Sequence, residues 1–241
     1  MRFFALSGLT IAMALAACSN GEDANAQSDT APTHSASADV PTTEGSDSEP
    51  RIVPAPEGSL AGGTMAMGSE DAPLTIIEYA SLTCPGCAVF HAQILPEIKE
   101  KYIDTGKVRF EFREFPTPPK NLAYAGSYLA RCAATTKGSP AYFAMIDTLF
   151  KRQQDWAYSP TPGETLEEIA AQAGINREAL QDCFFREDVK SAVRANVNAG
   201  IEAHKVGQTP TFIVNDKHFD WGRSASNMAD AIDAELAKLE Q

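Results

Sequence analysis

A Cys-Pro-Gly-Cys tetrapeptide at positions 84–87 is the feature that most constrains this chain, because it lies between two segments of different periodicity. Residues 74–80 are a β-branched and aromatic run, which predicts a buried strand. After the tetrapeptide, apolar side chains recur every three or four residues, as in a helix: Val89, Phe90, Ile94, Leu95 and Ile98. The sequence therefore places both cysteines at the start of a helix that follows a buried strand.

This helix leads into a second strand. Pro96 lacks a backbone donor, so we expect it to kink the helix, and Gly106 ends the unit. Residues 108–113 alternate between apolar and charged side chains, which predicts a strand. A strand, a helix and a strand in this order form a βαβ unit with parallel pairing.

The rest of the chain is helical first and mixed afterwards. No strand pattern interrupts residues 118–186, where we expect helices at 121–134, 141–152, 166–173 and 177–185. The expected elements that follow are a helix at 189–205, strands at 211–215 and near 218–219, and a final helix at 226–239. The pattern predicts an α/β fold in which a helical block separates a βαβ half from a ββα half.

The N-terminus has the properties of an export signal. Arg2 supplies a short positive region, and residues 3–15 form an apolar run that is too short for a permanent membrane span. The string Leu-Ala-Ala-Cys at 15–18 resembles the lipobox of bacterial lipoproteins, in which Cys18 becomes the lipid-carrying first residue. We therefore expect a lipoprotein signal peptide at 1–17. The alternative is an ordinary secreted protein cleaved near the same position, with this cysteine incidental.

Residues 18–61 contain almost no large apolar side chain and are rich in small and polar residues. Such a segment buries too little surface to offset its conformational entropy, so we expect a disordered tether. A lipid on Cys18 would hold the following domain at the periplasmic side of a bacterial membrane, and Ser19 favours the outer membrane. The net charge of −12 argues against nucleic acid as a partner, because phosphate binding needs a concentrated basic surface.

The chain has five cysteines, and an odd number in an exported protein needs an explanation. Lipidation of Cys18 leaves Cys84, Cys87, Cys132 and Cys183. Export places these four in a compartment where disulfides persist.

Cys84 and Cys87, with two residues between them on the first turn of a helix, can close a small disulfide ring. Unpaired N–H groups and the helix dipole favour a thiolate there, so we expect Cys84 to be acidic and nucleophilic. The thiolate is the form that attacks a disulfide, so this placement suits thiol–disulfide exchange. The spacing alone also fits half of a zinc site or an inert disulfide, although no second C-x-x-C or spaced histidine pair completes four zinc ligands.

Three motifs in order make the chain resemble the DsbA family of thioredoxin-fold proteins. They are an acid, Glu78, six residues before the first cysteine; the C-P-x-C motif; and G-x-T-P-T-F at 207–212. Residues 112–116 also resemble the loop that follows the second strand in that family. The resemblance covers residues 62–241 and implies a thioredoxin-like fold with an inserted all-helical domain.

The resemblance also implies a division of the chain and a substrate contact. The thioredoxin-like domain comprises residues 62–117 and 187–241, and the helical insertion comprises 118–186. Thr209–Pro210 is expected to be a cis peptide beside the active disulfide, where both residues contact an extended substrate peptide. A trans proline at the start of an edge strand is the alternative.

Two further site roles follow from the resemblance. It gives Glu78 the role of proton acceptor for Cys87, the resolving cysteine, although from the residues alone Glu78 could equally face solvent. Some relatives have a second disulfide in the helical insertion, and we expect Cys132 and Cys183 to form it. Two reduced core cysteines are the alternative.

The activity that the resemblance implies is disulfide exchange with thiols of exported proteins, catalysed by Cys84 and Cys87. We expect a monomer that needs no cofactor and no metal and that exchanges electrons with a membrane redox partner. Strong oxidants of the family commonly carry His in place of Gly86 and Val in place of Thr209, so the direction stays open. The alternatives are a reductase or isomerase kept reduced by a membrane donor, and a non-enzymatic metal-binding or structural module.

The remaining conspicuous side chains are expected to have no chemical role. His91 lies seven residues after Cys84 on the same helix, near the site but outside the chemistry. Trp156, Tyr158 and Trp221 are interpreted as packing residues.

Overall fold

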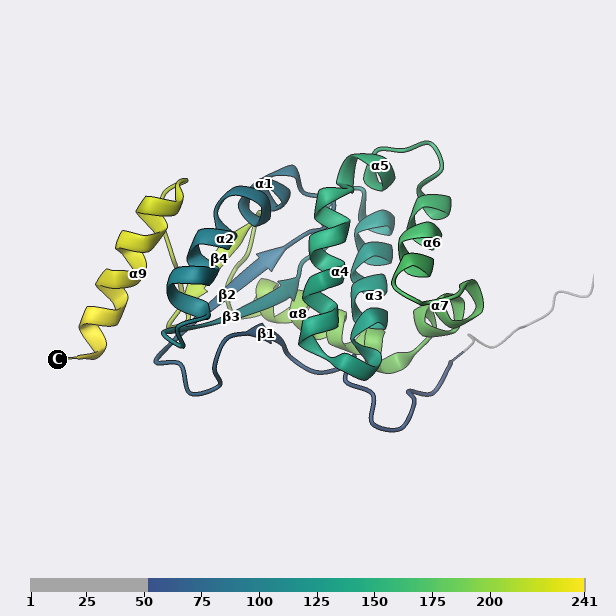
Figure 1. Cartoon of the computed structure of the whole chain (residues 1–241), viewed down its shortest axis with the longest axis horizontal. Coiled ribbons are helices and arrows are strands. Elements are labelled where there is room, and N and C mark those ends of the chain that lie inside the picture. The colour runs from purple at the N-terminus through teal and green to yellow at the C-terminus, as the bar shows by residue number, and fades with distance from the viewer. Residues whose placement is uncertain (1–51, 241) are drawn as a thin grey trace, which may run out of the picture. The chain divides into compact units, whose positions relative to one another are not determined.

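The centre of the fold is a five-stranded sheet with the strand order β1-β3-β2-β4-β5, seen in a computed structural model that describes residues 52–240 (Figure 1). The strands are β1 (Met65–Met67), β2 (Leu74–Ala80), β3 (Val108–Glu114), β4 (Thr211–Val214) and β5 (Lys217–His218). β2 and β3 pair in parallel, and the other neighbouring pairs are antiparallel. The predicted βαβ unit is confirmed, and β1 is an edge strand that the sequence pattern does not predict.

Helices cover both faces of this sheet (Figure 1). They are α1 (Pro85–Gln93), α2 (Leu95–Ile98) and α9 (Ala225–Leu239) on one face, and α8 (Glu187–Glu202) on the other. Side chains alternate between the faces along each strand: Ile76 and Phe110 are buried with Ile232 of α9, whereas Tyr79 and Ile213 belong to the opposite core. Within residues 52–240, no helix is both long enough and apolar enough to span a bilayer.

The predicted helical block lies beside the sheet in Figure 1. Between residues 118 and 186 it contains α3 (Lys120–Lys137), α4 (Ser139–Lys151), α5 (Gln153–Ala157), α6 (Pro162–Gln172) and α7 (Arg177–Phe184). Its core includes Leu129, Tyr142 and Trp156, and this core continues to Leu82 and Cys87 of the sheet domain. Trp156 is fully buried, as its interpretation as a packing residue requires. The α/β class and the helical block are confirmed, and α5 is an addition to the predicted helices.

The helix after the two cysteines breaks where the sequence predicts. α1 and α2 meet at Ile94, Pro96 occupies the first turn of α2, and a π-helical segment, η1 (Lys99–Ile103), follows. The periodicity is wrong for one residue, because Val89 is 49% exposed. This side chain lines a surface hollow instead of the core.

The last residues of the predicted tether pack against the domain, so the structure differs from a tether that extends to residue 61. Ala61 is fully buried, and Ser59 Oγ donates to Asp188 Oδ2 at 2.8 Å. Composition misses this contact because it depends on a few polar and backbone groups rather than on large apolar side chains. Residues 1–51, with the predicted signal peptide and Cys18, lie outside the described residues.

A buried ion pair joins the sheet to the helical block. Arg131 Nε and Nη2 donate to the two carboxylate oxygens of Glu114 at 2.6 and 2.9 Å. Tyr142 and Asn196 donate to the same carboxylate at 2.7 and 2.6 Å, and Arg131 also donates to the carbonyl of Ala61 at 2.7 Å. Burial by itself raises the pKa of Glu114, but the charge of Arg131 and these hydrogen bonds outweigh burial and lower it. Elements from four parts of the chain therefore meet at one carboxylate.

Candidate active site

The two cysteines of the tetrapeptide differ in their access to other molecules. Cys84 is the N-cap residue of α1 and is partly exposed, whereas Cys87, one turn further, is fully buried. Both are free thiols in this structure. Pro85 occupies the first helical turn, where it costs no hydrogen bond because the first N–H groups of a helix have no helical acceptor. Of this pair, only the Cys84 sulfur is therefore accessible to a second molecule.

The environment of Cys84 makes its thiol acidic. Its pKa is lowered from an ordinary value of 9.0 to about 5. A hydrogen bond with the Cys87 thiol is the largest cause, and partial burial opposes it. Hydrogen bonds with the Thr209 side chain and with the backbone of Cys87 and Gly86 lower the pKa further. Cys84 is therefore a thiolate, and hence a nucleophile, at neutral pH.

Cys87 has the opposite properties. Burial raises its pKa well above the ordinary value, and the hydrogen bond with Cys84 and the charge of Glu78 raise it further. A buried thiol of this kind stays protonated until a neighbouring group accepts the proton. The pair is thus asymmetric, with an outer sulfur that attacks and an inner sulfur that reacts only within the protein.

Glu78 and His91 form a buried pair beneath the cysteines. Glu78 on β2 is fully buried, so the solvent-facing alternative for this residue does not hold. Its Oε2 lies 2.8 Å from Nε2 of His91 on α1, and its Oε1 has no hydrogen-bond partner. His91 lies four residues after Cys87, so both side chains stand on one face of the helix. The sequence prediction leaves His91 outside the site, and this four-residue spacing is the signal that could have included it.

The loop before β4 closes over the start of α1. The Thr209–Pro210 peptide is cis, and the backbone oxygen of Thr209 lies 3.3 Å from the Cys84 sulfur. A Cβ added to Gly86 would stand 3.4 Å from Pro210 Cδ, an ordinary contact distance. The structure therefore brings together the two motifs that the sequence separates by more than a hundred residues.

A hollow of about 730 Å³ extends from this loop along α1. Its lining includes Val89 of α1, Pro210, and the aromatic side chains of Phe219 and Trp221. Trp221 packs against Phe90 at 5.8 Å between ring centroids, so this tryptophan both packs and lines the hollow. The hollow therefore offers both polar and apolar surface, and it begins at Gly86 and Pro210 beside the partly exposed Cys84.

The helical block supports the active-site turn from the other side. Gln153 Nε2 donates to the carbonyl oxygens of Leu82 and Cys84 at 2.8 and 3.1 Å. Tyr158 donates its hydroxyl to the carbonyl oxygen of Thr83 at 3.2 Å and is 51% exposed. Tyr158 therefore lies at the rim of the site, which corrects its interpretation as a packing residue. Gln153 carries no local sequence signal, because its role depends on how the block folds back.

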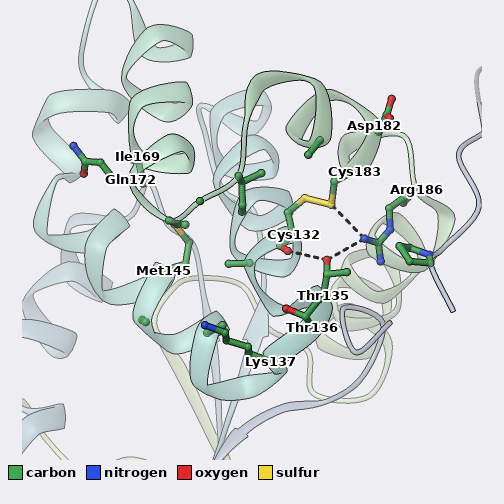
Figure 2. Close-up of a pocket in the computed structure, with 18 of the residues that line it drawn as sticks. Cys132, Thr135, Thr136, Lys137, Met145, Ile169, Gln172, Asp182, Cys183 and Arg186 are labelled. Atoms are coloured by element: carbon green, nitrogen blue, oxygen red, sulfur yellow. Dashed lines mark hydrogen bonds between the residues drawn. A yellow bond between two sulfur atoms is a disulfide. The ribbon is translucent and has the colours of Figure 1, made fainter. Parts of the chain in front are cut away.

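A second cysteine pair lies in the helical block. Cys132 and Cys183 form a disulfide of 2.05 Å that joins α3 to α7 (Figure 2). They line a hollow of about 890 Å³, where Arg186 Nη1 donates to Thr135 Oγ1 at 2.9 Å. Neither cysteine of the tetrapeptide lines this hollow, so it is separate from the candidate site. Among residues 52–240, no three His, Cys, Asp or Glu side chains form a group suited to a metal ion.

Comparison with known proteins identifies similar sequences. A model of the family described as Thioredoxin matches residues 60–234. The "Putative protein-disulfide oxidoreductase" of Rickettsia prowazekii is 36% identical over 173 residues, which are 71% of this chain and 61% of that protein. The "Disulfide bond formation protein D" of Bacillus subtilis is 31% identical over 162 residues, which are 64% of this chain and 69% of that protein. The chain therefore spans less than two thirds of the rickettsial relative.

Solved structures show the same fold. Wolbachia pipientis alpha-DsbA1 is 27% identical with a TM-score of 0.64, over 74% of this chain and 93% of that one. Oxidised BdbD from Bacillus subtilis has a TM-score of 0.64 at 24% identity, over 78% of this chain and 100% of that one. The chain belongs to the thioredoxin family. Within that family it is DsbA-like, and the predicted thioredoxin-like fold with inserted helices is confirmed.

Proposed function

We propose that this chain is an enzyme that exchanges disulfides with cysteine thiols of exported proteins through Cys84 and Cys87. The observation that carries the proposal is the asymmetry of the pair: a partly exposed thiol with a pKa of about 5 lies next to a buried thiol with a raised pKa. Acidic, accessible thiols are those that attack and leave readily in disulfide exchange. The names of the relatives support the same activity.

The oxidising reaction starts from the Cys84–Cys87 disulfide. A substrate thiolate attacks the Cys84 sulfur, a mixed disulfide forms, and Cys87 leaves and takes up a proton. The second substrate thiolate then attacks the substrate sulfur of the mixed disulfide, and Cys84 leaves as a thiolate. The substrate has lost two electrons and gained a disulfide, and the enzyme holds both electrons as a reduced pair. Because Cys84 is a stable thiolate and leaves readily, the last step favours oxidation of the substrate.

The loop at Thr209–Pro210 and the hollow beside it are the proposed substrate contact. Backbone groups of an extended peptide can pair with this loop, and apolar side chains that flank the substrate cysteine can occupy the hollow. Val89, Phe219 and Trp221 line the hollow within reach of such a peptide. The proposed ligand is thus a flexible, partly unfolded segment rather than a folded surface.

The first experiment removes the nucleophile. Cys84→Ala should lose turnover of a reduced, unfolded substrate protein in a glutathione buffer, and Cys87→Ala should accumulate the mixed disulfide with that substrate. Thr148→Ala is a control for handling and folding, because the Thr148 hydroxyl donates only to the carbonyl of Ala144 on its own helix, away from the cysteine pair. Unchanged substrate oxidation in Cys84→Ala would refute the proposed function.

The direction of exchange has a separate test. Equilibration of the Cys84–Cys87 couple with glutathione gives its reduction potential. A potential near that of thioredoxin, about −270 mV, would contradict an oxidase and favour the reductase or isomerase, and a potential near that of DsbA, about −120 mV, would support an oxidase. The in vivo redox state of the pair answers the same question in the cell.

We also propose that the enzyme acts at the periplasmic side of a bacterial membrane, held by a lipid on Cys18, where a membrane protein restores its redox state. The lipobox-like string at 15–18 supports the anchor. Labelled palmitate should be incorporated into the chain and lost in Cys18→Ser. Labelling that persists in this variant, or is absent from the wild type, would contradict the anchor.

A further inference from the structure

Glu78 and His91 are buried where a charged side chain has few partners. In the sheet, Glu78 stands opposite Phe112 of β3 and Phe212 of β4. The His91 ring packs against Phe150 at 4.4 Å between centroids and against Phe112 at 5.7 Å. A buried carboxylate among aromatic rings is costly unless a donor satisfies it. His91 is the donor that the structure provides.

The two oxygens of Glu78 are in different situations. A carboxylate has no hydrogen, so His91 Nε2 must carry one and donate it to Oε2 at 2.8 Å. Oε1 is equally buried and has no hydrogen-bond partner. An acceptor left open in the interior needs an explanation. The thiol of Cys87 supplies one, because it is buried, near enough to be influenced by the charge of Glu78, and must lose a proton to react.

We propose that His91 is a positioning residue for the resolving step: its Nε2–H holds Oε2 of Glu78, which leaves Oε1 free to accept the proton of Cys87 and to return it. The inference rests on the proposed function. It adds a residue that the family resemblance does not supply.

The step balances in both directions. In resolution, the Cys87 proton moves to Glu78 Oε1, and the Cys87 thiolate attacks the Cys84 sulfur of a mixed disulfide. A new Cys84–Cys87 bond forms while the bond from Cys84 to the substrate sulfur breaks, so the substrate leaves as a thiolate. In substrate oxidation, Cys87 is the leaving group and takes the same proton back from Glu78.

Other ionisable groups near the pair have partners of their own. Tyr142 of α4 packs its ring against Phe112 and is influenced by the charge of Glu78, but its hydroxyl donates to Glu114 at 2.7 Å. Glu114 is in turn paired with Arg131 of α3. From α1, the facing groups are the two active-site thiols. Among the described residues, Glu78 is therefore the carboxylate whose charge acts on the Cys87 thiol, and His91 is its hydrogen-bond partner.

An aryl disulfide, dithiobis(nitrobenzoate), separates the two chemical steps in one stopped-flow trace. The Cys84 thiolate of the reduced protein attacks the reagent and releases a first nitrothiobenzoate, at a rate that increases with reagent concentration. Cys87 then attacks the Cys84 sulfur and releases a second nitrothiobenzoate, at a rate independent of concentration. The second phase alone reports the proton transfer from Cys87.

His91→Phe fills the aromatic surroundings but removes the donor. We expect its second phase to slow by at least about tenfold at neutral pH, within the usual contribution of general acid–base catalysis. His91→Gln, which keeps an N–H near the Nε2 position, should recover most of the rate. His204→Gln, a buried histidine bonded to Tyr79 on the other face of the sheet, should match the wild type.

The outcomes separate this inference from the proposed function. A normal first phase with an unchanged second phase in His91→Phe refutes the role of His91 and leaves the proposed function intact. Absence of a fast first phase in the wild type would instead refute the proposed function. If His91→Phe does not fold, His91→Leu, a smaller apolar replacement that also lacks the donor, and Glu78→Gln are compared singly and together. Additive effects on the second phase would then overturn the inference, because residues that act as a unit are not additive.

Discussion

Cys84 reaches a pKa of about 5 although the residue between the proline and the inner cysteine is glycine. The stabilising contacts come from the Cys87 thiol, from Thr209 and from backbone groups, so a side chain at position 86 is not required. The corresponding thiol pKa is about 3.5 in DsbA and about 7 in thioredoxin. We therefore expect the reduction potential of this couple to lie between theirs, at about −270 to −120 mV.

The acidity of Cys84 gives a pH profile for both reactivity and stability. The rate of Cys84 alkylation by iodoacetamide should be half-maximal near pH 5, the pKa of the folded thiol. Because folding lowers this pKa from 9.0, the unfolded chain binds more protons between the two values. The reduced protein should therefore gain stability as pH rises from about 5 to 9, and lose it as pH falls through 5. Alkylation of Cys84→Ser checks that Cys84 is the reacting group, and a midpoint near pH 8 would contradict the assigned environment.

Gly86 is the position where one substitution should strengthen the oxidant. A Cβ at this position meets Pro210 Cδ at 3.4 Å and the Cys84 sulfur at 3.7 Å, which are ordinary contacts, so a side chain fits. Gly86→His adds a donor next to the thiolate, so we expect the pKa of Cys84 to fall and the reduction potential to rise, measured by equilibration with glutathione. Gly86→Ala adds the carbon without the donor and should leave the potential near that of the wild type. An equal rise in both variants would show that the donor is not the cause.

Single residues of the site differ in whether the sequence predicts them. Cys84, Cys87 and Pro210 are found by motif, because their chemistry depends on backbone positions that the motif itself sets. Glu78 is found by resemblance, but its partner His91 is not, since a histidine on a helix has no visible partner until the strand beneath it is placed. Composition and spacing identify reactive groups more readily than the groups that tune them.

At the scale of elements, periodicity predicts the long helices and the strands buried in the core, because burial of one face is what produces the period. β1 and α5 are missed for the same reason. β1 has three residues, too few to show alternation, and α5 is held by Gln153 and the buried Trp156 rather than by an apolar stripe. Short elements form because their neighbours hold them, and a single sequence does not contain that information.

The ion pair of Arg131 and Glu114 should contribute strongly to the free energy of unfolding, because it joins the sheet to the helical block. Arg131→Met leaves a buried carboxylate without its charge partner and removes the donor to the Ala61 carbonyl. Breaking a buried pair in this way typically costs about 3–5 kcal/mol of the free energy of unfolding, which urea unfolding measures. The exposed pair of Lys151 and Asp147 is the control: Lys151→Met should cost less than about 1 kcal/mol. Equal losses in the two variants would contradict the expectation that the buried pair stabilises the protein more than the exposed pair.

At the scale of the whole molecule, the domain is divided between two parts of the chain. The nucleophile lies after β2, the loop that faces it lies before β4, and the helical block lies between them in sequence. The block is more than a spacer, since Gln153 and Tyr158 bond to the turn that carries Cys84. The stability of the block therefore affects the geometry of the site, although the block supplies none of the reacting atoms.

The Cys132–Cys183 disulfide separates these two contributions. It closes a sequence separation of 51 residues between α3 and α7. In the chain-entropy model, a loop of about that length stabilises the fold by roughly 4 kcal/mol. The double variant Cys132→Ala/Cys183→Ala should therefore unfold at much lower urea concentration, while the attack of Cys84 on an aryl disulfide keeps its rate and its pH midpoint.

The two readouts distinguish a structural bridge from a second redox centre. A structural bridge changes stability and leaves the exchange kinetics alone, because neither of its cysteines lines the hollow beside Cys84. If the double variant kept its stability but exchanged disulfides with the substrate more slowly, the bridge would take part in the reaction. If the oxidised wild type were alkylated at Cys132 or Cys183 without reduction, the bridge would not exist in solution. The bridge thus contributes to the stability of the helical block. Disulfide exchange depends instead on the tetrapeptide and on the buried Glu78.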